Sequence, residues 1–124
     1  MDERRNIGRW GEDVAARYVE GLGWTILDRN WRFSRVGELD LVALDPSDGA
    51  RTLVFCEVKT KSGDGFGAPL EAITWAKLSR LNRLACAWMA SHATGFDRIR
   101  IDAIGVMGKP GQSYQVTHAE GVRL

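Results

Sequence analysis

Two apolar segments joined by a turn restrict what this chain can fold into. Residues 38–44 and 52–60 have the continuous apolar character of strands buried on both faces of a sheet. Between them, the sequence Asp-Pro-Ser-Asp-Gly at residues 45–49 is a strong turn signal. We therefore expect a central β-hairpin, which other elements must cover on both sides.

The flanking sequence supplies those elements. Helical periodicity predicts one helix at about residues 11–22 and a longer one at about 69–92. Further strands are expected at 24–27, running into a basic and aromatic stretch at 29–35, and at 99–106 and 114–117, separated by a turn at 108–111. Residues 62–67 form a glycine-rich loop. The order αβββαββ predicts an α/β fold in which helices flank a central mixed sheet, and the length of 124 residues predicts a single domain over residues 1–124.

Composition limits the classes of partner. The net charge is only +1, so an anionic partner must be held by a local cluster of cations. No signal peptide and no membrane-length apolar run are visible, and the two cysteines lie in apolar segments without metal-ligand spacing. We expect buried free thiols, a cytoplasmic location and no membrane association.

Charged residues in the predicted hairpin require an explanation. Asp40 is the only charge in an apolar stretch, and a buried carboxylate without a partner costs several kcal/mol. Folding the hairpin about Asp48 and Gly49 places Asp40 opposite Glu57, and Glu38 opposite Lys59. Two carboxylates that face each other repel, and a cation between them makes the arrangement tolerable.

The helices repeat this pattern. Lys77 lies in the middle of the apolar stripe of the long helix, at about 100° per residue. Glu12 lies on the apolar side of the first helix, near Val19. Five charged residues are therefore predicted to face inward from elements that pack together: Glu12, Asp40, Glu57, Lys59 and Lys77.

Two or three carboxylates with a lysine favour Mg²⁺ (or Mn²⁺), which prefers oxygen ligands and acts on phosphates. Such a metal polarises a phosphodiester and acidifies a bound water, and a lysine can orient that water or stabilise developing charge. The alternative is structural: two buried salt bridges, Glu38 with Lys59 and Asp40 with an arginine.

The residues also match a known pattern. "GELDLV", a turn and then "VFCEVKTK" resembles the metal-binding core of the PD-(D/E)xK restriction-endonuclease-like superfamily. Nearly the whole chain resembles the YraN family of small bacterial predicted endonucleases, which are similar to archaeal Holliday-junction resolvases. The blocks that carry the match are "GRWGEDVAARYVEGLGWTILDRNWR", "GELDLVA", "EVKTK", "APLEAITWAKLSRLNRLACAW" and "RIRIDAIGV".

The resemblance implies a restriction-endonuclease-like fold and an endonuclease that acts on DNA. It implies that Asp40, Glu57 and Lys59 are catalytic. In the resolvase-like branch a glutamate of the first helix joins the metal site, which corresponds to Glu12, so the implied Mg²⁺ ligands are Glu12, Asp40 and Glu57. The superfamily's usual proline before the aspartate is replaced by Leu39, and the resolvase-like branch also dispenses with it.

Basic residues suggest where a nucleic acid would lie. Arg32 and Arg35 alternate with Trp31 and Phe33, which is typical of a phosphate-contacting segment with stacking groups. Alternatively, this segment is a solvated strand edge with Trp31 in the core. The remaining candidates are Lys61, for which a plain surface position is the alternative, and Lys77 and Arg80 on the long helix.

Other features favour structural roles. Arg100 and Asp102 share a strand face and are expected to pair, whereas Trp75 and Trp88 are interpreted as packing residues. His92 and His118 have no ligand pattern near them.

Two classes of function remain open from the sequence. The first is a metal-dependent endonuclease acting on DNA, with branched and single-stranded forms among the candidates; RNA processing is a weaker variant of it. The second is a non-catalytic nucleic-acid-binding or assembly module that retains the nuclease fold. A homodimer would join basic patches that one subunit lacks.

Overall fold

The computed structural model describes residues 3–62 and 74–123. The central hairpin forms as predicted, from strands β2 (Gly37–Asp45) and β3 (Thr52–Lys61). The short 3-10 helix η1 (Ser47–Gly49) connects them, and Asp48 has a φ of 61° there. Aspartate tolerates this left-handed conformation better than most residues, which suits it to a tight connection.

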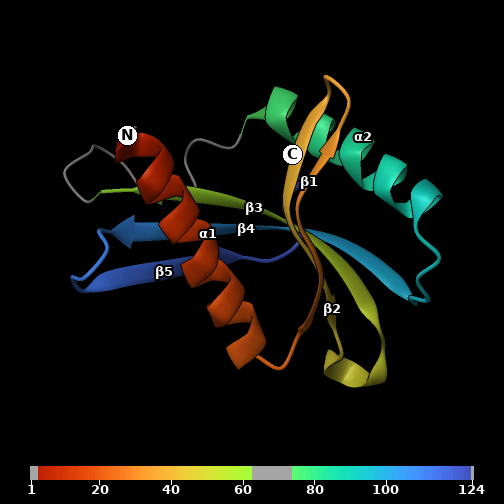
Figure 1. The fold of residues 1–124 in the computed structure, drawn as a ribbon. Helices are drawn as coiled ribbons and strands as arrows, with labels where there is room; N and C mark the ends of the chain where they lie inside the picture. The colour runs from red at the N-terminus through yellow and green to blue at the C-terminus, as the bar shows by residue number, and fades with distance from the viewer. Residues whose placement is uncertain (1–2, 63–73, 124) are drawn as a thin grey trace.

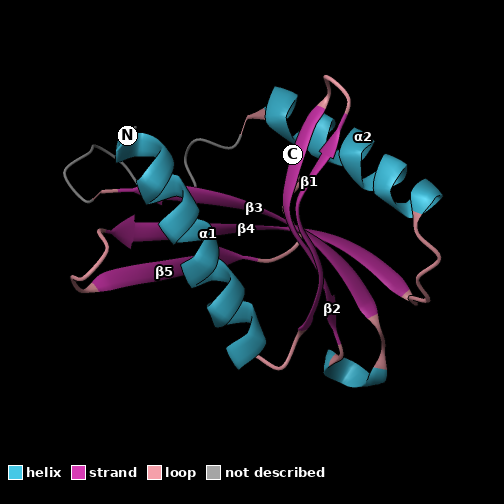
Figure 2. Cartoon of the chain, viewed as in Figure 1, coloured by secondary structure: helices cyan, strands magenta, loops and turns pink. Residues whose placement is uncertain are grey.

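Three more strands complete a mixed sheet in the order β1-β2-β3-β4-β5 (Figures 1 and 2). They are β1 (Thr25–Phe33), β4 (Arg98–Gly108) and β5 (Tyr114–Ala119). All neighbouring pairs are antiparallel except β3 and β4, which are parallel and are connected through the second helix. The predicted order αβββαββ and the α/β class are confirmed, and the architecture is consistent with a restriction-endonuclease-like fold.

Each face of the sheet carries its own apolar cluster. Helix α1 (Glu3–Gly21) contributes Val14, Ala15, Ala16 and Val19 to one cluster, which includes Val54 and Cys56 of β3. Helix α2 (Trp75–Ser91) contributes Leu81, Leu84, Ala85 and Trp88 to the other, which includes Leu53 and Phe55. Alternate residues of β3 therefore enter opposite clusters, which explains why this strand is continuously apolar.

Several boundaries differ from the prediction. Helix α1 begins at Glu3 rather than near residue 11, because its first turns are polar and exposed and lack the apolar stripe on which the prediction relied. Strand β1 extends through the basic stretch to Phe33. Helix α2 begins after Thr74, whose side chain accepts a hydrogen bond from the Lys77 N–H. Residues 69–73 of the predicted helix and 63–67 of the predicted loop lie outside the described residues.

Two predictions about individual side chains are wrong. Cys56 is buried as expected, but Cys86 is exposed on the outer side of α2. Trp88 is a core residue, whereas 70% of Trp75 is exposed at the start of the same helix. Both errors have one cause: the first turns and the outer surface of a helix can carry apolar residues that pack against nothing.

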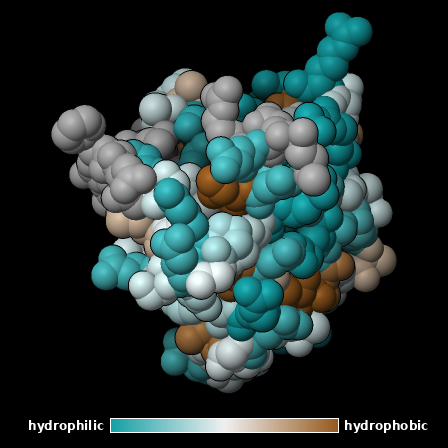
Figure 3. All heavy atoms as spheres, turned by 60° about the vertical axis from the view of Figure 1, so that its left-hand side comes forward, coloured by the Kyte–Doolittle hydropathy of each residue, from teal (hydrophilic) through white to brown (hydrophobic). Residues whose placement is uncertain are grey.

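In Figure 3 the visible face is mainly hydrophilic, with apolar side chains in small separate patches. Within residues 3–62 and 74–123, neither helix is both long and apolar enough to cross a membrane.

Candidate active site

Strands β2 and β3 separate at Asp40. Their pairing has the predicted register from Asp45 opposite Thr52 up to Leu41 opposite Cys56, where it stops. Beyond that point Asp40 Oδ2 accepts a hydrogen bond of 2.8 Å from the Val58 N–H. Figure 1 shows the far part of the β1–β2 hairpin turning away from β3 toward α2. The side chain of Asp40 therefore lies in the opening between the two strands.

The neighbouring strand is irregular at the same level. In β1, Arg29 is opposite Leu41 and Trp31 is opposite Leu39, which places Asn30 across from Asp40. Asn30 has a φ of 51°, a left-handed conformation inside a strand. Leu41 and Leu39 consequently belong to clusters on opposite faces of the sheet, although they are two residues apart. The twist that opens the site is thus located at Asn30 and Asp40.

Asp40 is surrounded by carboxylates. Burial and the charge of Glu57 raise the pKa of Asp40 to about 8, against the lowering effect of the Val58 N–H. Glu12 and Glu38 raise the Asp40 pKa further. The Glu57 side chain is itself only 9% exposed. A divalent cation stabilises such an arrangement, because neighbouring negative carboxylates repel one another and the positive ion offsets that repulsion.

The structural alternative is not supported. The predicted Glu38–Lys59 pair does not form, because the register ends before these residues. Instead, Lys59 Nζ lies 3.5 Å from Glu57 Oε1, and Glu38 Oε2 lies 3.5 Å from Arg32. Among the described residues, no arginine lies in an ion pair with Asp40. Glu38, which the sequence reading assigned to a salt bridge, instead belongs to the acidic surroundings of Asp40.

Glu12 reaches the site because α1 approaches β3 closely. A Cβ at Gly11 would overlap the side chain of Thr60, so only glycine permits this approach. Asn30 Nδ2 then donates a hydrogen bond of 2.8 Å to Glu12 Oε1. Glu12 lines two open hollows of about 480 and 690 Å³, the first shared with Lys59 and Lys61 and the second with Asn30 and Glu38.

Cations gather on the α2 side of this acidic group. The half-buried Lys77 lies beside Lys59, whose proximity lowers the pKa of Lys77. Burial and the charge of Arg80 lower the Lys77 pKa as well, while Glu57 raises it. The structure therefore places Lys77 near Lys59 and Glu57, as the phase of the helix predicted. Two adjacent ammonium groups repel, and an anionic ligand would relieve that repulsion.

The predicted nucleic-acid-binding residues line different hollows of the surface. Arg35 and Arg80 line the same surface groove. Lys61 lines the hollow that contains Glu12 and Lys59. The side chain of Arg32 is 68% exposed and pairs weakly with Glu38. Trp31 stacks on Phe33 and packs against the α2-side cluster, so β1 combines a core aromatic residue with an exposed basic edge.

The donor set suits Mg²⁺ or Mn²⁺. Asp40, Glu57 and Glu12 present only carboxylate oxygens, which are the ligands these ions prefer. They come from three different elements that meet where β2 leaves β3. The three do not all bring an oxygen within 4.8 Å of one another in the described structure, so their carboxylates would have to come closer together to share one ion.

A second polar cluster surrounds Asp102 of β4, which lies opposite Cys56 of β3, and the sequence indicated only part of it. Arg100 Nε donates to Asp102 Oδ1 at 2.8 Å, which confirms the predicted pair. Asp102 also accepts from His118 Nε2 at 2.7 Å, and His118 Nδ1 bonds to the Tyr18 hydroxyl at 3.0 Å. His118 had no local ligand pattern because its partners come from α1 and β4.

Asp102, His118 and Glu120 form a group that could hold a metal ion, with ligand atoms within 4.8 Å of one another. However, the Arg100 guanidinium already contacts both oxygens of Asp102. Burial opposes ionisation of Asp102, but the bonds from His118 and Arg100 lower its pKa overall. With its charge already balanced, this cluster has the features of a structural network.

The sequence of residues 11–106 matches a protein family described as "Uncharacterised protein family UPF0102". Similar proteins include UPF0102 proteins of Mycolicibacterium gilvum, 43% identical over 98% of this chain and 96% of the relative, and of Frankia alni, 46% identical over 98% and 97%. A UPF0102 protein of Acidothermus cellulolyticus is 41% identical over 95% of this chain and 93% of its own length. These matches confirm the YraN-like resemblance inferred from the sequence.

Proposed function

The chain belongs to the uncharacterised protein family UPF0102, and from the site described above we propose that it is a Mg²⁺-dependent endonuclease that hydrolyses phosphodiester bonds in DNA. One observation carries the proposal. At the point where β2 leaves β3, the half-buried and crowded carboxylate of Asp40 lies among other carboxylates, with Lys59 and Lys77 beside them. A site with acidic residues on one side and basic residues on the other suits a metal ion together with a phosphate.

Asp40 and Glu57 would hold Mg²⁺ (or Mn²⁺), with Glu12 as a further ligand. When bound, the ion supplies a Lewis acid for the phosphodiester and lowers the pKa of a coordinated water. Asp40 is held in place by the Val58 N–H, and Glu12 by Asn30. Both carboxylates are therefore oriented by neighbours that lie outside the ligand set.

Lys59 is the residue placed to act on the reacting phosphate. Its ammonium lies 3.5 Å from Glu57 and is 29% exposed, so it can reach a ligand while it remains paired. In this position it stabilises negative charge that develops on the non-bridging oxygens or orients the attacking water. Lys77, adjacent to Lys59, adds a second positive charge for the phosphate backbone.

The alternative is a nucleic-acid-binding or assembly module that does not cleave. An intact set of carboxylates with its lysine favours cleavage over binding alone, because buried like charges destabilise a fold that has no use for them. DNA is the proposed substrate, RNA is a variant that the same chemistry could serve, and a homodimer would extend the basic surface.

The test is cleavage of a substrate panel by the purified protein. Linear, flapped, four-way and single-stranded DNA and a matched RNA are each incubated with Mg²⁺, with Mn²⁺ or with EDTA. We expect cleavage of at least one DNA substrate that requires metal and disappears in Asp40→Asn. The Asp45→Asn variant is a control, since Asp45 is another aspartate of β2 but pairs with Ser47 and Arg100 away from the site.

Cleavage that persists in EDTA or in Asp40→Asn would contradict the assignment. Binding to DNA without cleavage of any substrate would favour the non-catalytic module.

A further inference from the structure

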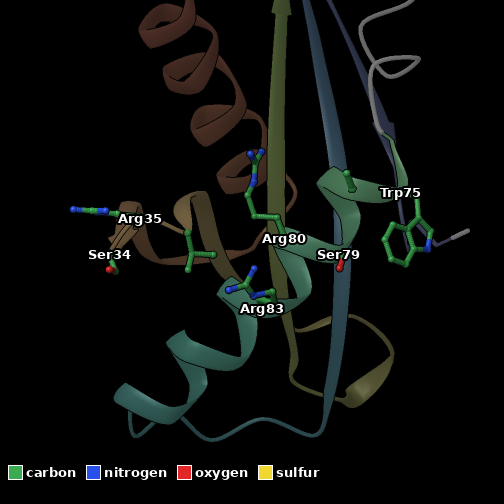
Figure 4. Close-up of a pocket in the computed structure, with 8 residues that line it drawn as sticks. Ser34, Arg35, Trp75, Ser79, Arg80 and Arg83 are labelled. Carbon is green, nitrogen blue, oxygen red and sulfur yellow. The ribbon is translucent and has the colours of Figure 1, made fainter.

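A basic groove runs between the β1–β2 turn and the outer surface of α2. It is open, with a volume of about 490 Å³. Figure 4 shows the indole of Trp75 and the guanidinium group of Arg35 on opposite sides of Arg80 and Arg83. The groove also contains two serines and small apolar side chains, and its full lining is Ser34, Arg35, Val36, Trp75, Ala76, Ser79, Arg80 and Arg83.

Its three arginines are available to a ligand. Arg35, Arg80 and Arg83 are exposed, and none is in an ion pair with a carboxylate of residues 3–62 or 74–123. Four other arginines of the described residues do have such partners, as Arg29 does with Asp13 at 2.6 Å. Three unpaired guanidinium groups around one hollow form a site for a polyanion.

Arg80 lies beside the first residue of β2. Gly37 has a φ of 142°, and a Cβ there would lie 3.4 Å from Arg80 Cδ, which is ordinary van der Waals contact. The aliphatic part of Arg80 therefore packs close to Gly37 while the residue lines the groove. Such a contact along the stem limits the conformations of a long side chain and so reduces the entropy cost of binding.

Trp75 contributes a flat apolar surface. It is 70% exposed, the largest exposed fraction among the large apolar residues that are described. It is absent from both apolar clusters of the core. An exposed indole beside arginines matches the combination by which proteins bind unpaired nucleic acid, with bases stacked on aromatic rings and phosphates on cations.

We propose that this groove binds a single-stranded segment of nucleic acid, with one unpaired base stacked on Trp75 and the phosphates on Arg80, Arg83 and Arg35. The inference rests on the proposed function for the class of ligand and narrows it to substrates with an unpaired segment. The bases of a duplex are covered by their neighbours in the stack, so a duplex offers the indole no free face except at its ends.

Helix α2 connects the groove to the candidate active site, because it carries both Arg80 and Lys77. Arg80 interacts electrostatically with Lys77, and Lys77 lies beside Lys59. A strand held along α2 would therefore follow a line of cations from the groove to Lys59. This places the unpaired segment next to the position of cleavage and would make a junction or flap the preferred substrate.

The test measures binding in EDTA, so that cleavage plays no part. A short fluorescein-labelled oligothymidylate and a duplex of the same charge are titrated with protein and followed by anisotropy at several salt concentrations. We expect Trp75→Ala to weaken binding of the single strand roughly tenfold, with Trp75→Phe close to wild type and the duplex little affected. Arg83→Ala should reduce the slope of log K against log salt by about 0.7.

Arg17→Ala is the matched control, since it removes an exposed arginine of α1 and should leave single-strand binding unchanged. Melting temperatures of all variants show that each one folds. Unchanged single-strand binding in both Trp75→Ala and Arg83→Ala would overturn the proposal. It would also be overturned if polyglutamate of equal charge competed as well as the oligonucleotide, because the groove would then be a general site for acidic chains.

A protein that cleaves DNA but binds single strands independently of Trp75 would refute this inference alone. A protein that needs Trp75 for strand binding but does not cleave would refute the nuclease alone.

Discussion

The carboxamide of Asn30 in β1 donates a hydrogen bond of 2.8 Å to the carboxylate of Glu12 in α1. Asn30 holds a left-handed backbone conformation, with a φ of 51°, directly across from Asp40. One residue thus combines a backbone irregularity that opens the sheet with a side chain that orients a proposed metal ligand. Such conformations cost about 1–3 kcal/mol and persist where the surrounding structure requires them.

Asn30 is therefore predicted to position Glu12. Asn30→Gly keeps the backbone conformation but removes the hydrogen bond, so Mn²⁺ affinity should fall several-fold while the melting temperature stays close to wild type. Asn30→Ala removes both features and should also lower the melting temperature. Titration calorimetry and thermal unfolding distinguish these effects. Wild-type Mn²⁺ affinity in Asn30→Gly would show that the hydrogen bond does not position Glu12.

The stability of the metal-free protein should depend on the charge of Asp40. Burial and the charge of Glu57 raise the Asp40 pKa to about 8, whereas unfolded aspartate has a pKa of about 3.9. Between these values the folded state binds a proton that the unfolded chain has lost, so the free energy of unfolding falls as the pH rises through this window.

The Asp40→Asn variant has no ionisable group at this position, so its free energy of unfolding does not fall for this reason as the pH rises. In EDTA its melting temperature should exceed that of wild type by several degrees at pH 8.5 and should be similar near pH 4.5. Mn²⁺ binding should strengthen in wild type as the pH rises toward 8, because the ion competes with the proton, and should be absent in Asp40→Asn. A melting-temperature difference that is the same at both pH values would show that Asp40 is not the titrating group.

Lys59 should affect the rate of cleavage more than stability. Its ammonium lies 3.5 Å from the buried Glu57 carboxylate, so Lys59→Ala leaves that carboxylate without an ion pair and should cost about 1–3 kcal/mol of stability. Loss of a group that stabilises the transition state should reduce single-turnover cleavage by about 10²–10³-fold. Anisotropy measured in EDTA should show little loss of DNA binding. A variant that is destabilised but cuts at the wild-type rate would exclude the catalytic role.

Two glycines of α1 provide an internal comparison. A Cβ at Gly11 would overlap Thr60, whereas a Cβ at Gly8 would meet nothing within 4 Å. Alanine improves helix propensity by about 1 kcal/mol at either position. Gly8→Ala should therefore raise the free energy of unfolding, while Gly11→Ala should lower it, and Thr60→Ala should partly rescue the second variant. Chemical denaturation measures all three, and equal stabilisation by both alanines would mean that α1 does not need this close approach.

The network around Asp102 should support the fold and not metal binding. Asp102→Asn leaves Arg100 without its main partner and should cost about 3 kcal/mol of stability. The milder Glu120→Gln changes an exposed member of the second candidate metal group, and Mn²⁺ affinity should be unaffected. Loss of Mn²⁺ binding in Glu120→Gln would place the ion at the Asp102 group instead of at Asp40.

Local sequence determined the central hairpin. The turn at residues 45–49 brings the two apolar runs opposite each other, and folding about Asp48 and Gly49 predicts the register that the structure has from Asp45 to Leu41. The order of the elements was predicted from local patterns of the same kind, and so was the inward-facing position of Lys77 on its helix. These features depend on residues close together in the chain, whose spacing is visible in the sequence.

Tertiary structure decided what lies beyond Leu41. The register ends where Asn30 bends β1. The end of the register depends on contacts with β3 and α1, which no local sequence pattern reveals. The same is true of Glu12, which reaches the site only because Gly11 approaches Thr60, and of His118, whose partners Tyr18 and Asp102 come from other elements. Trp75 was misread because hydrophobicity predicts burial only when a neighbour is present to cover the side chain, and packing of distant elements decides which neighbours are present.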